Sequence, residues 1–252
     1  MMKNRKGEFE KRTALVTGGS RGIGRSTCLM LAASGARVAI NFANNKDAAN
    51  ETLRMVKELG AEGMIIQADV SSEKDVNNMV KNVSAELGPI DLLVNNAGIA
   101  VSQSHLAISF ADWKRMFEVN VDGVFLTTWA VKNQMIDQGY GRIVNVASLA
   151  GIILKKEMIH YATAKASVIS FTRHCSEAFA PHNIRVNCVA PGLTDTDIAQ
   201  SANPDSINQL INSTPLGRMA VPGEIANVIH FLLSEDASFV TGQTIVACGG
   251  RS

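Results

Sequence analysis

The chain repeats one pattern along most of its 252 residues: a short apolar run, then a longer segment with a helical pattern. The apolar runs lie at 14–16, 38–40, 64–66, 92–94, 143–146, 184–189 and 244–246. They do not alternate with polar residues, which indicates strands that are buried on both faces. Helices between such strands make right-handed crossovers. We therefore expect an α/β protein with a doubly wound, mostly parallel sheet of seven strands and helices on both faces.

Composition favours a single domain over residues 1–252. Hydrophobic residues make up 46% of the chain, enough for one large core, and no repeat or Pro/Ser-rich linker divides it. Residues 1–12 are charged, and we expect a polar N-terminal extension there. Residues 193–219 are rich in Thr, Asp, Asn and Pro and carry the weakest strand signal, so we expect a substrate-binding excursion over the sheet.

Charge and cysteine usage argue against several classes of protein. The 24 basic and 23 acidic residues nearly cancel, so neither nucleic acid nor a membrane surface is an expected partner. No run approaches the ~20 apolar residues of a membrane span. The four cysteines form no C-x-x-C and the histidines no H-E-x-x-H, so we expect no metal site. These features together favour a cytoplasmic protein.

A glycine-rich segment, TGGSRGIG at 17–24, lies between the first expected strand and the first helix. Glycines let the backbone approach a pyrophosphate, which the helix N-terminus then stabilises. Three other interpretations stay open. Gly18 to Gly22 matches the G-x-S-x-G elbow of hydrolases, with Ser20 as nucleophile. The segment also approaches a P-loop, but with Arg25 in place of Lys, and a turn without a ligand is the third alternative.

The second expected strand indicates which dinucleotide is preferred. An acid that binds the ribose 2′-hydroxyl of NAD should follow that strand, but no acid occurs between Ile40 and Asp47. Arg21 could pair with a 2′-phosphate. The sequence therefore favours NADP(H) over NAD(H).

Tyr161 and Lys165 are four residues apart, on one face of an expected helix. A phenol of pKa ~10 is a poor base at neutral pH, and a nearby cation favours its phenolate. The pair could serve as a general acid or base at a carbonyl oxygen, although such pairs also occur on ordinary surface helices.

Further polar residues follow the expected strands in order: Asn95 to Gly98, Asn120, Ser148, and Pro191-Gly192. With the glycine segment and Tyr161/Lys165, this set resembles the short-chain dehydrogenase/reductase family over essentially the whole chain, nearest to its 3-oxoacyl-(acyl-carrier-protein) reductase-like members. The resemblance implies a single-domain Rossmann fold. It also implies a homotetramer that packs through the helices beginning near Val121 and Tyr161 and through the C-terminal strand.

The resemblance implies four catalytic residues. Tyr161 would exchange a proton with the substrate oxygen, and Lys165 would lower its pKa and hold the nicotinamide ribose. Ser148 would hydrogen-bond the substrate oxygen, and Asn120 would hold a water that relays protons. Cofactor contacts are implied for Gly18, Ser20, Arg21, Gly22, Ile23, Gly24, Asn41, Asp69, Val70, Asn96, Ala97, Gly98, Tyr161, Lys165, Pro191, Gly192, Thr194 and Thr196.

Some of these polar residues have simpler interpretations. Asp69 could cap a turn, Asn95 could bond backbone between strands, and Cys188 could be inert core. His160 could line the pocket or face solvent.

The expected activity is NADP(H)-dependent interconversion of a small-molecule ketone, 3-oxoacyl-type or otherwise apolar, with a secondary alcohol. Apolar residues precede Tyr161 and favour an acyl or alkyl substrate, although they could equally be core or subunit contacts: Ile152, Ile153, Leu154, Met158 and Ile159. Sugar, polyol or xenobiotic alcohols are the alternative within the family. A Ser20 hydrolase and a non-catalytic dinucleotide sensor are the alternatives outside it. Related reductases dock acidic carrier proteins through two basic residues. The matching positions here are Gly139 and Glu177, so we expect no preference for a carrier protein.

Overall fold

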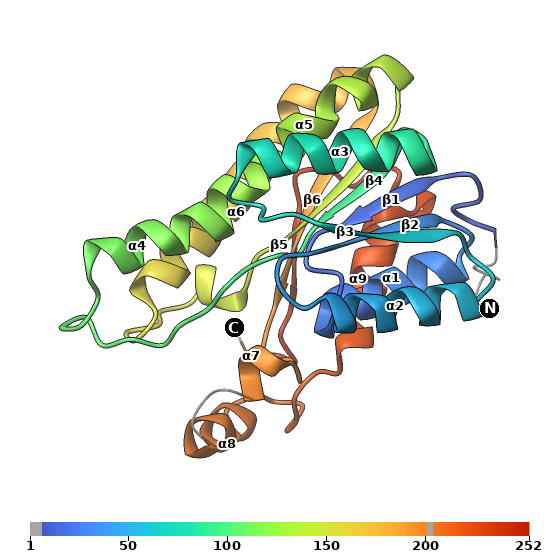
Figure 1. Ribbon diagram of the computed structural model, residues 1–252. Coiled ribbons are helices and arrows are strands. Elements are labelled where there is room, and N and C mark those ends of the chain that lie inside the picture. Colours follow the sequence, from blue (N-terminus) through green and yellow to red (C-terminus); the bar gives the residue numbers. More distant parts are fainter. Residues whose placement is uncertain (1–6, 201–203, 252) are drawn as a thin grey trace.

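The computed structural model describes residues 7–200 and 204–251, and one seven-stranded sheet organises them (Figure 1). Its order is β3-β2-β1-β4-β5-β6-β7. The strands are β1 Thr13–Val16, β2 Arg37–Phe42, β3 Gly63–Gln67, β4 Ile90–Asn95, β5 Gly141–Val146, β6 Ile184–Pro191 and β7 Thr244–Ala247. Every pairing between neighbouring strands is parallel. The expected doubly wound α/β fold is confirmed, and its sheet is wholly rather than mostly parallel.

Helices cover both faces of the sheet (Figure 1). They are α1 Gly22–Ala33, α2 Lys46–Glu58, α3 Glu73–Leu87, α4 Phe110–Phe117, α5 Gly123–Gln138, α6 Ile159–Phe179, α7 Asp197–Gln200, α8 Pro204–Asn212 and α9 Pro222–Leu233. One face carries α1, α2 and α9, and the other carries α3, α5 and α6, while α7 and α8 project away from the sheet. No helix in the described ranges is long and apolar enough to cross a bilayer.

The order in which the chain adds strands to the sheet reverses between β1 and β4. The chain runs outward from β1 through β2 to β3 and then returns to place β4 against the other side of β1. In sheets of this type, ligands bind outside the carboxyl ends of the strands at such a reversal. The glycine segment after β1 and the asparagines at the end of β4 lie there.

The strands fill a separate core on each face. In β1, Ala14 and Val16 pack with the α1/α9 core, whereas Leu15 packs with the α3/α5 core. Each fully buried Val or Leu side chain stabilises the fold by about 1.5–3 kcal/mol. The period-2 geometry of a strand explains why runs buried on both faces show no polar alternation.

The N-terminal extension is more than a polar tail. Phe9 is 2% exposed, belongs to the α1/α9 core, and meets the His230 ring edge-on at a centroid distance of 5.0 Å. Its backbone N–H donates to the Ser34 carbonyl at 2.9 Å. Residues 1–6 lie outside the described part. Phe9 thus docks a segment whose neighbours Glu10 and Lys11 stay exposed, so the expected polar extension is attached to the core at one aromatic side chain.

The 193–219 segment leaves and rejoins the fold at one place. A parallel bridge pairs Thr194 with Ala220, and the Ala220 N–H donates to the Leu193 carbonyl at 3.0 Å. Between these positions lie α7 and α8. The excursion is thus closed at its base beside the end of β6.

Candidate active site

The glycine segment forms a tight turn that leads into α1. Gly18 and Gly22 have φ angles of 62° and 54°, and a Cβ on Gly24 would lie 2.2 Å from the Gly18 carbonyl oxygen. Side chains of Asn45 and Ser72 cap α2 and α3, but no side chain caps α1. The first N–H groups of α1 therefore lack a side-chain acceptor, as a phosphate-binding helix N-terminus requires.

Asn41, an expected cofactor contact, supports the glycine turn from inside the protein. Its side chain is 1% exposed, its Oδ1 accepts from the Gly18 N–H at 3.2 Å, and its Nδ2 donates to the Ala68 carbonyl at 3.0 Å. Both ends of the amide are thus occupied by backbone. In the structure Asn41 supports the glycine turn, and its direct contact with a cofactor stays a prediction.

Thr17, which sequence reasoning passed over, joins the glycine turn to the end of β4. Its Oγ1 accepts from the N–H groups of Asn96 and Ala97, both at 3.0 Å. The Asn96 amide donates in return to the carbonyls of Thr17 at 3.0 Å and Gly18 at 3.1 Å. Asn96 and Ala97 therefore lie directly against the turn. The position of Thr17 directly before the glycines is the sequence feature that could have indicated this role.

Arg25, in the place of the P-loop lysine, also holds the turn. Its Nη2 and Nε donate to the Ser20 carbonyl at 2.8 and 3.1 Å, and Thr52 donates to the same oxygen at 3.0 Å. Ser20 is 8% exposed, and within the described ranges its hydroxyl makes no hydrogen bond to a histidine or carboxylate. Nothing in the structure activates Ser20 as a hydrolase nucleophile.

Ser148, Tyr161 and Lys165 come together beside the end of β5. Ser148 follows that strand, and its Oγ accepts from the Ala150 N–H at 3.1 Å. Tyr161 and Lys165 share one face of α6, with the Lys165 Nζ 5.8 Å from the centre of the Tyr161 ring. Ser148 hydrogen-bonds the Tyr161 side chain. Because Tyr161 and Lys165 are four residues apart on one helix, their side chains lie next to each other, as expected.

Burial sets the protonation of this cluster. It raises the pKa of Tyr161 above its usual value, against the hydrogen bond from Ser148, which lowers it. Burial also lowers the pKa of Lys165 to about 8. We expected Lys165 to lower the pKa of Tyr161, but the largest effect on this pKa is burial, which disfavours the charged phenolate and raises it.

Asn120 lies on a π-helical turn, Glu118–Asp122, which joins α4 to α5. Its Nδ2 donates to the carbonyls of Ile99 at 2.9 Å and Met116 at 3.1 Å, but its buried Oδ1 has no partner among the described residues. A Cβ on Gly98 would lie 2.6 Å from this Oδ1 and 3.3 Å from the Lys165 Nζ. Asn120, Gly98 and Lys165 are therefore neighbours, and the unpaired oxygen is suited to hold a water.

Asn95 belongs to a buried network beneath the site. Its Nδ2 donates to Asn145 Oδ1 at 2.8 Å, the Asn145 Nδ2 donates to Thr172 Oγ1 at 2.9 Å, and Thr127 donates to Asn95 Oδ1 at 2.6 Å. The chain of bonds links β4, β5, α5 and α6. Asn95 is therefore buried within the structure, as expected, but among the described residues it bonds side chains and not the backbone between strands, and the network ties α6 to the sheet at Thr172.

Two neighbouring residues have clear outcomes. Cys188 is fully buried, and burial raises its pKa to about 11, which agrees with inert core. His160 is 1% exposed. Of the two expected positions for His160, the one facing solvent is wrong, because α6 turns this side chain inward.

Asp69 and Val70 follow β3. The Asp69 carboxylate accepts from the Ser71 N–H at 2.9 Å and Oγ at 2.7 Å, and it lies 3.5 Å from Arg115. Val70 packs its side chain on α5, where a Cβ on Gly123 would lie 2.8 Å from it. Asp69 thus caps a turn, as its simpler interpretation held, and any contact from Val70 to an adenine would come from its backbone.

The segment after β6 lies against the glycine turn. Gly192 donates to the Ala247 carbonyl at 2.9 Å, and Thr194 Oγ1 donates to the Gly192 carbonyl at 3.2 Å. A Cβ on Gly22 would lie 3.1 Å from Thr196 Cγ2. The ends of β1 and β6, far apart in sequence, therefore face each other where a dinucleotide would lie. Pro191 ends β6 directly before this segment.

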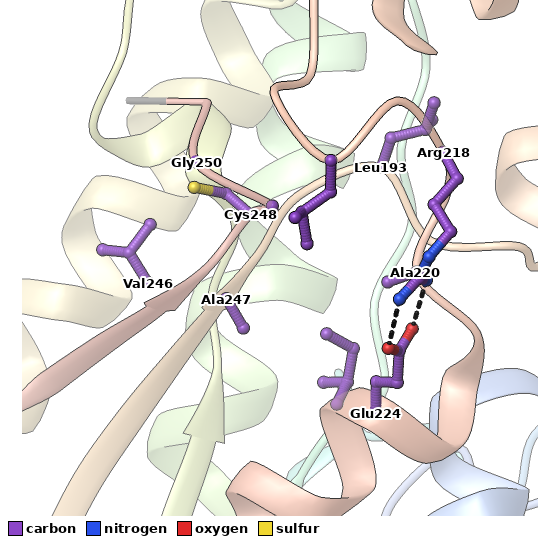
Figure 2. A pocket seen from close by; sticks show the side chains of 11 residues that line it. Leu193, Arg218, Ala220, Glu224, Val246, Ala247, Cys248 and Gly250 are labelled. Atoms are coloured by element: carbon purple, nitrogen blue, oxygen red, sulfur yellow. Dashed lines mark hydrogen bonds and ion pairs between the residues drawn. The ribbon is translucent and has the colours of Figure 1, made fainter.

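A pocket of about 460 Å³ lies beside the base of the excursion (Figure 2). Leu193, Ala220, Val246 and Cys248 are among its lining residues, and Arg218 pairs with Glu224 through two hydrogen bonds of 2.7 and 2.8 Å. Ser148, Tyr161 and Lys165 do not line it. The pocket is therefore separate from the polar cluster.

The fold, its glycine turn and the polar residues around them are those of an oxidoreductase that works with a nicotinamide dinucleotide. The chain belongs to the short-chain dehydrogenase/reductase family. The family model that matches residues 18–252 is described as enoyl-(acyl carrier protein) reductase. Members of this family act on CH–OH groups and on the corresponding carbonyls.

Known relatives cover nearly the whole chain. A 3-oxoacyl-(acyl-carrier-protein) reductase from Synechocystis sp. is 40% identical over 94% of this chain and 95% of its own length. One from Staphylococcus epidermidis is 38% identical over 95% of this chain and 98% of its own. Among solved structures, a short-chain type dehydrogenase/reductase from Mycobacterium marinum has a TM-score of 0.94 at 35% identity, covering 99% of this chain and 98% of that one. Levodione reductase gives 0.92 at 32% identity, covering 96% and 98%.

Proposed function

We propose that this protein reduces an apolar ketone, of the 3-oxoacyl type or a related alkyl ketone, to a secondary alcohol with NADPH. The observation that carries the proposal is the convergence of Ser148, Tyr161, Lys165 and the unpaired Asn120 Oδ1 beside Gly98, in the segment that packs on the glycine turn. The curated relatives named above are 3-oxoacyl reductases, which supports the substrate class.

The residues divide the work in the following way. A bound nicotinamide supplies the hydride. Ser148 hydrogen-bonds the ketone oxygen, and Tyr161 gives that oxygen its proton, since the raised pKa keeps the phenol protonated at neutral pH. Lys165, at hydrogen-bond distance from the Val146 carbonyl, carries the positive charge that stabilises the phenolate left behind. A water on Asn120 Oδ1 returns the proton to the cluster.

Two observations support NADPH as the preferred dinucleotide. Asn41, the residue at the end of β2 nearest to the turn, is a neutral amide buried under Gly18, so it places no carboxylate at the adenosine ribose. Arg21 lies at the start of α1 with 58% of its side chain exposed. A 2′-phosphate at the ribose would therefore meet the Arg21 guanidinium and no acid from the end of β2.

The surface around the polar cluster supports an apolar substrate. Leu154 is fully exposed, Ile152 is 49% exposed, and Leu106 and Phe110, on the facing segment, are 87% and 76% exposed. Apolar side chains gathered near a site mark a binding surface. This favours an acyl or alkyl ketone over a sugar or polyol.

A panel of ketones assayed by loss of NADPH absorbance tests the proposal. We expect turnover of 3-oxoacyl thioesters and alkyl ketones, and a lower KM with NADPH than with NADH. Ser20→Ala should retain turnover, which separates the proposal from a serine hydrolase. Binding of NADPH without turnover of any ketone would instead support the non-catalytic sensor.

We also propose a homotetramer. On the α5/α6 face, Phe125 and Trp129 are 40% and 41% exposed and stack at a centroid distance of 4.4 Å, next to Phe171. Phe239 and Val246, near the C-terminal strand, are also exposed. Two apolar surfaces on one chain suit two interfaces. Light scattering at micromolar protein should give the tetramer mass, and Trp129→Glu should reduce it.

The structure places Gly139, one of the two positions matched to carrier-docking residues, relative to the proposed site. Gly139 ends α5, the helix that begins next to Asn120, so it lies roughly 25 Å from the site. A carrier protein that contacted Gly139 would therefore lie far from the Asn120 end of the same helix. We still propose that coenzyme A thioesters are reduced at least as well as carrier-bound ones. Specificity constants for one acyl group on both carriers decide the point.

A further inference from the structure

An ion pair joins the glycine turn to the excursion. The Nη1 of Arg21 lies 2.7 Å from the Oδ2 of Asp197, the first residue of α7. Both side chains are more than half exposed. The preceding residue, Thr196, lies against Gly22, which holds the start of α7 close to the turn. The two partners are 176 residues apart in sequence, so only the fold brings them together.

This contact places a carboxylate on the cation proposed to receive the 2′-phosphate. A guanidinium that donates to a carboxylate has fewer N–H groups left for a phosphate, and two anions on one cation repel each other. NADH carries no such phosphate, so Asp197 has no matching effect on it. The difference between the two dinucleotides therefore depends on Asp197 as well as on Arg21.

We propose that Asp197 is a specificity-determining residue that weakens the preference for NADPH by competing with the 2′-phosphate for Arg21. The inference rests on the proposed function, because it requires the dinucleotide to lie over the glycine turn. It assigns to α7 a part in cofactor selection that the motif at 17–24 does not contain. The effect should be small, because exposed ion pairs are weak and screened by salt.

Direct binding measures the effect without turnover. The Kd for NADPH and NADH is determined by fluorescence titration for the unmodified protein, Asp197→Asn, Arg21→Ala and the double variant. We expect Asp197→Asn to lower the NADPH Kd about two- to fivefold and leave the NADH Kd unchanged. In the Arg21→Ala background, the second substitution should no longer affect NADPH.

A matched control comes from α2. Glu58→Gln also removes an acid from an exposed ion pair, with Arg54, and changes net charge by the same amount. It should leave both Kd values unchanged, which separates a local competition from a general charge effect.

Three results would overturn the inference: equal weakening of both dinucleotides in Asp197→Asn, an unchanged NADPH Kd, or the same gain in the Arg21→Ala background. The first would mean that the ion pair only fastens α7 to the turn. Failure of the unmodified protein to bind either dinucleotide is a separate result, and it would overturn the proposed function itself.

Discussion

The two sides of the proposed site are built differently. On the cofactor side, buried and half-buried side chains hold the glycine turn in place: Asn41 bonds Gly18, Thr17 bonds Asn96 and Ala97, and Arg25 bonds Ser20. On the substrate side, Leu106, Leu154 and Leu216 are 87%, 100% and 66% exposed. One side is defined by hydrogen bonds to backbone and the other by apolar surface.

The difference shows where precision is required. A pyrophosphate and a nicotinamide have fixed shapes and need hydrogen-bond donors held in place. Several side chains therefore hold the glycine turn in one conformation. An alkyl group needs only an apolar surface, because hydrophobic contact is non-directional. Substitutions on the cofactor side should therefore have large, specific effects, and those on the substrate side small, graded ones.

The largest effect is expected where the two sides meet. Tyr161→Phe keeps the ring but removes the transferable proton, so kcat should fall by about 10²–10⁴-fold. The Kd for NADPH should change little, because the glycine turn is untouched. Near-normal kcat would show that another group supplies the proton, and the buried His160 would be the next candidate.

The pH dependence should report Lys165. Its pKa is lowered to about 8, so raising the pH through that value removes the positive charge that stabilises the Tyr161 phenolate. We expect kcat/KM for ketone reduction to fall about tenfold per pH unit above this limb. Lys165→Arg keeps its charge, and the limb should move to higher pH. A limb that stays in place in this variant would assign it to another group.

On the cofactor side, Asn41→Ala removes the acceptor for the Gly18 N–H without touching the ligand. An unsatisfied buried N–H costs about 1–3 kcal/mol, so we expect the Kd of both dinucleotides to rise about tenfold. Asn133→Ala, at an exposed position on α5, is the control and should change neither. If Asn41→Ala behaved like the control, the turn would not depend on this support, and the contrast between the two sides would weaken.

The smallest effect is expected on the substrate side. Leu154→Ser alters a fully exposed side chain, so the free energy of unfolding should stay within about 0.5 kcal/mol. The KM for a long alkyl ketone should rise only a few-fold, and that for a short ketone should not change. A large loss with both ketones would mean that Leu154 orders the site rather than simply contacting the chain of the substrate.

Features that depend only on neighbouring residues in the sequence were predicted correctly. Apolar runs gave the strands, and the four-residue spacing gave the Tyr161/Lys165 pair. Features that depend on distant contacts were missed, such as the packing of Phe9 on His230 and the pairing of Arg21 with Asp197. Asn41 shows the limit most clearly: the family resemblance implied a cofactor contact, but the hydrogen bonds of its side chain to Gly18 and Ala68 depend on distant parts of the chain. The individual site assignments stay predictions for the experiments above.

The bridge between Thr194 and Ala220 has an evolutionary consequence. Because both ends of the excursion meet at one point, the chain between them can be exchanged, lengthened or shortened while the sheet keeps its register. Loop-closure entropy grows slowly, by about 0.6 kcal/mol for each doubling of length. One contiguous stretch of a gene can therefore change the part of the substrate surface that the excursion carries, such as Leu216, while the strands stay the same.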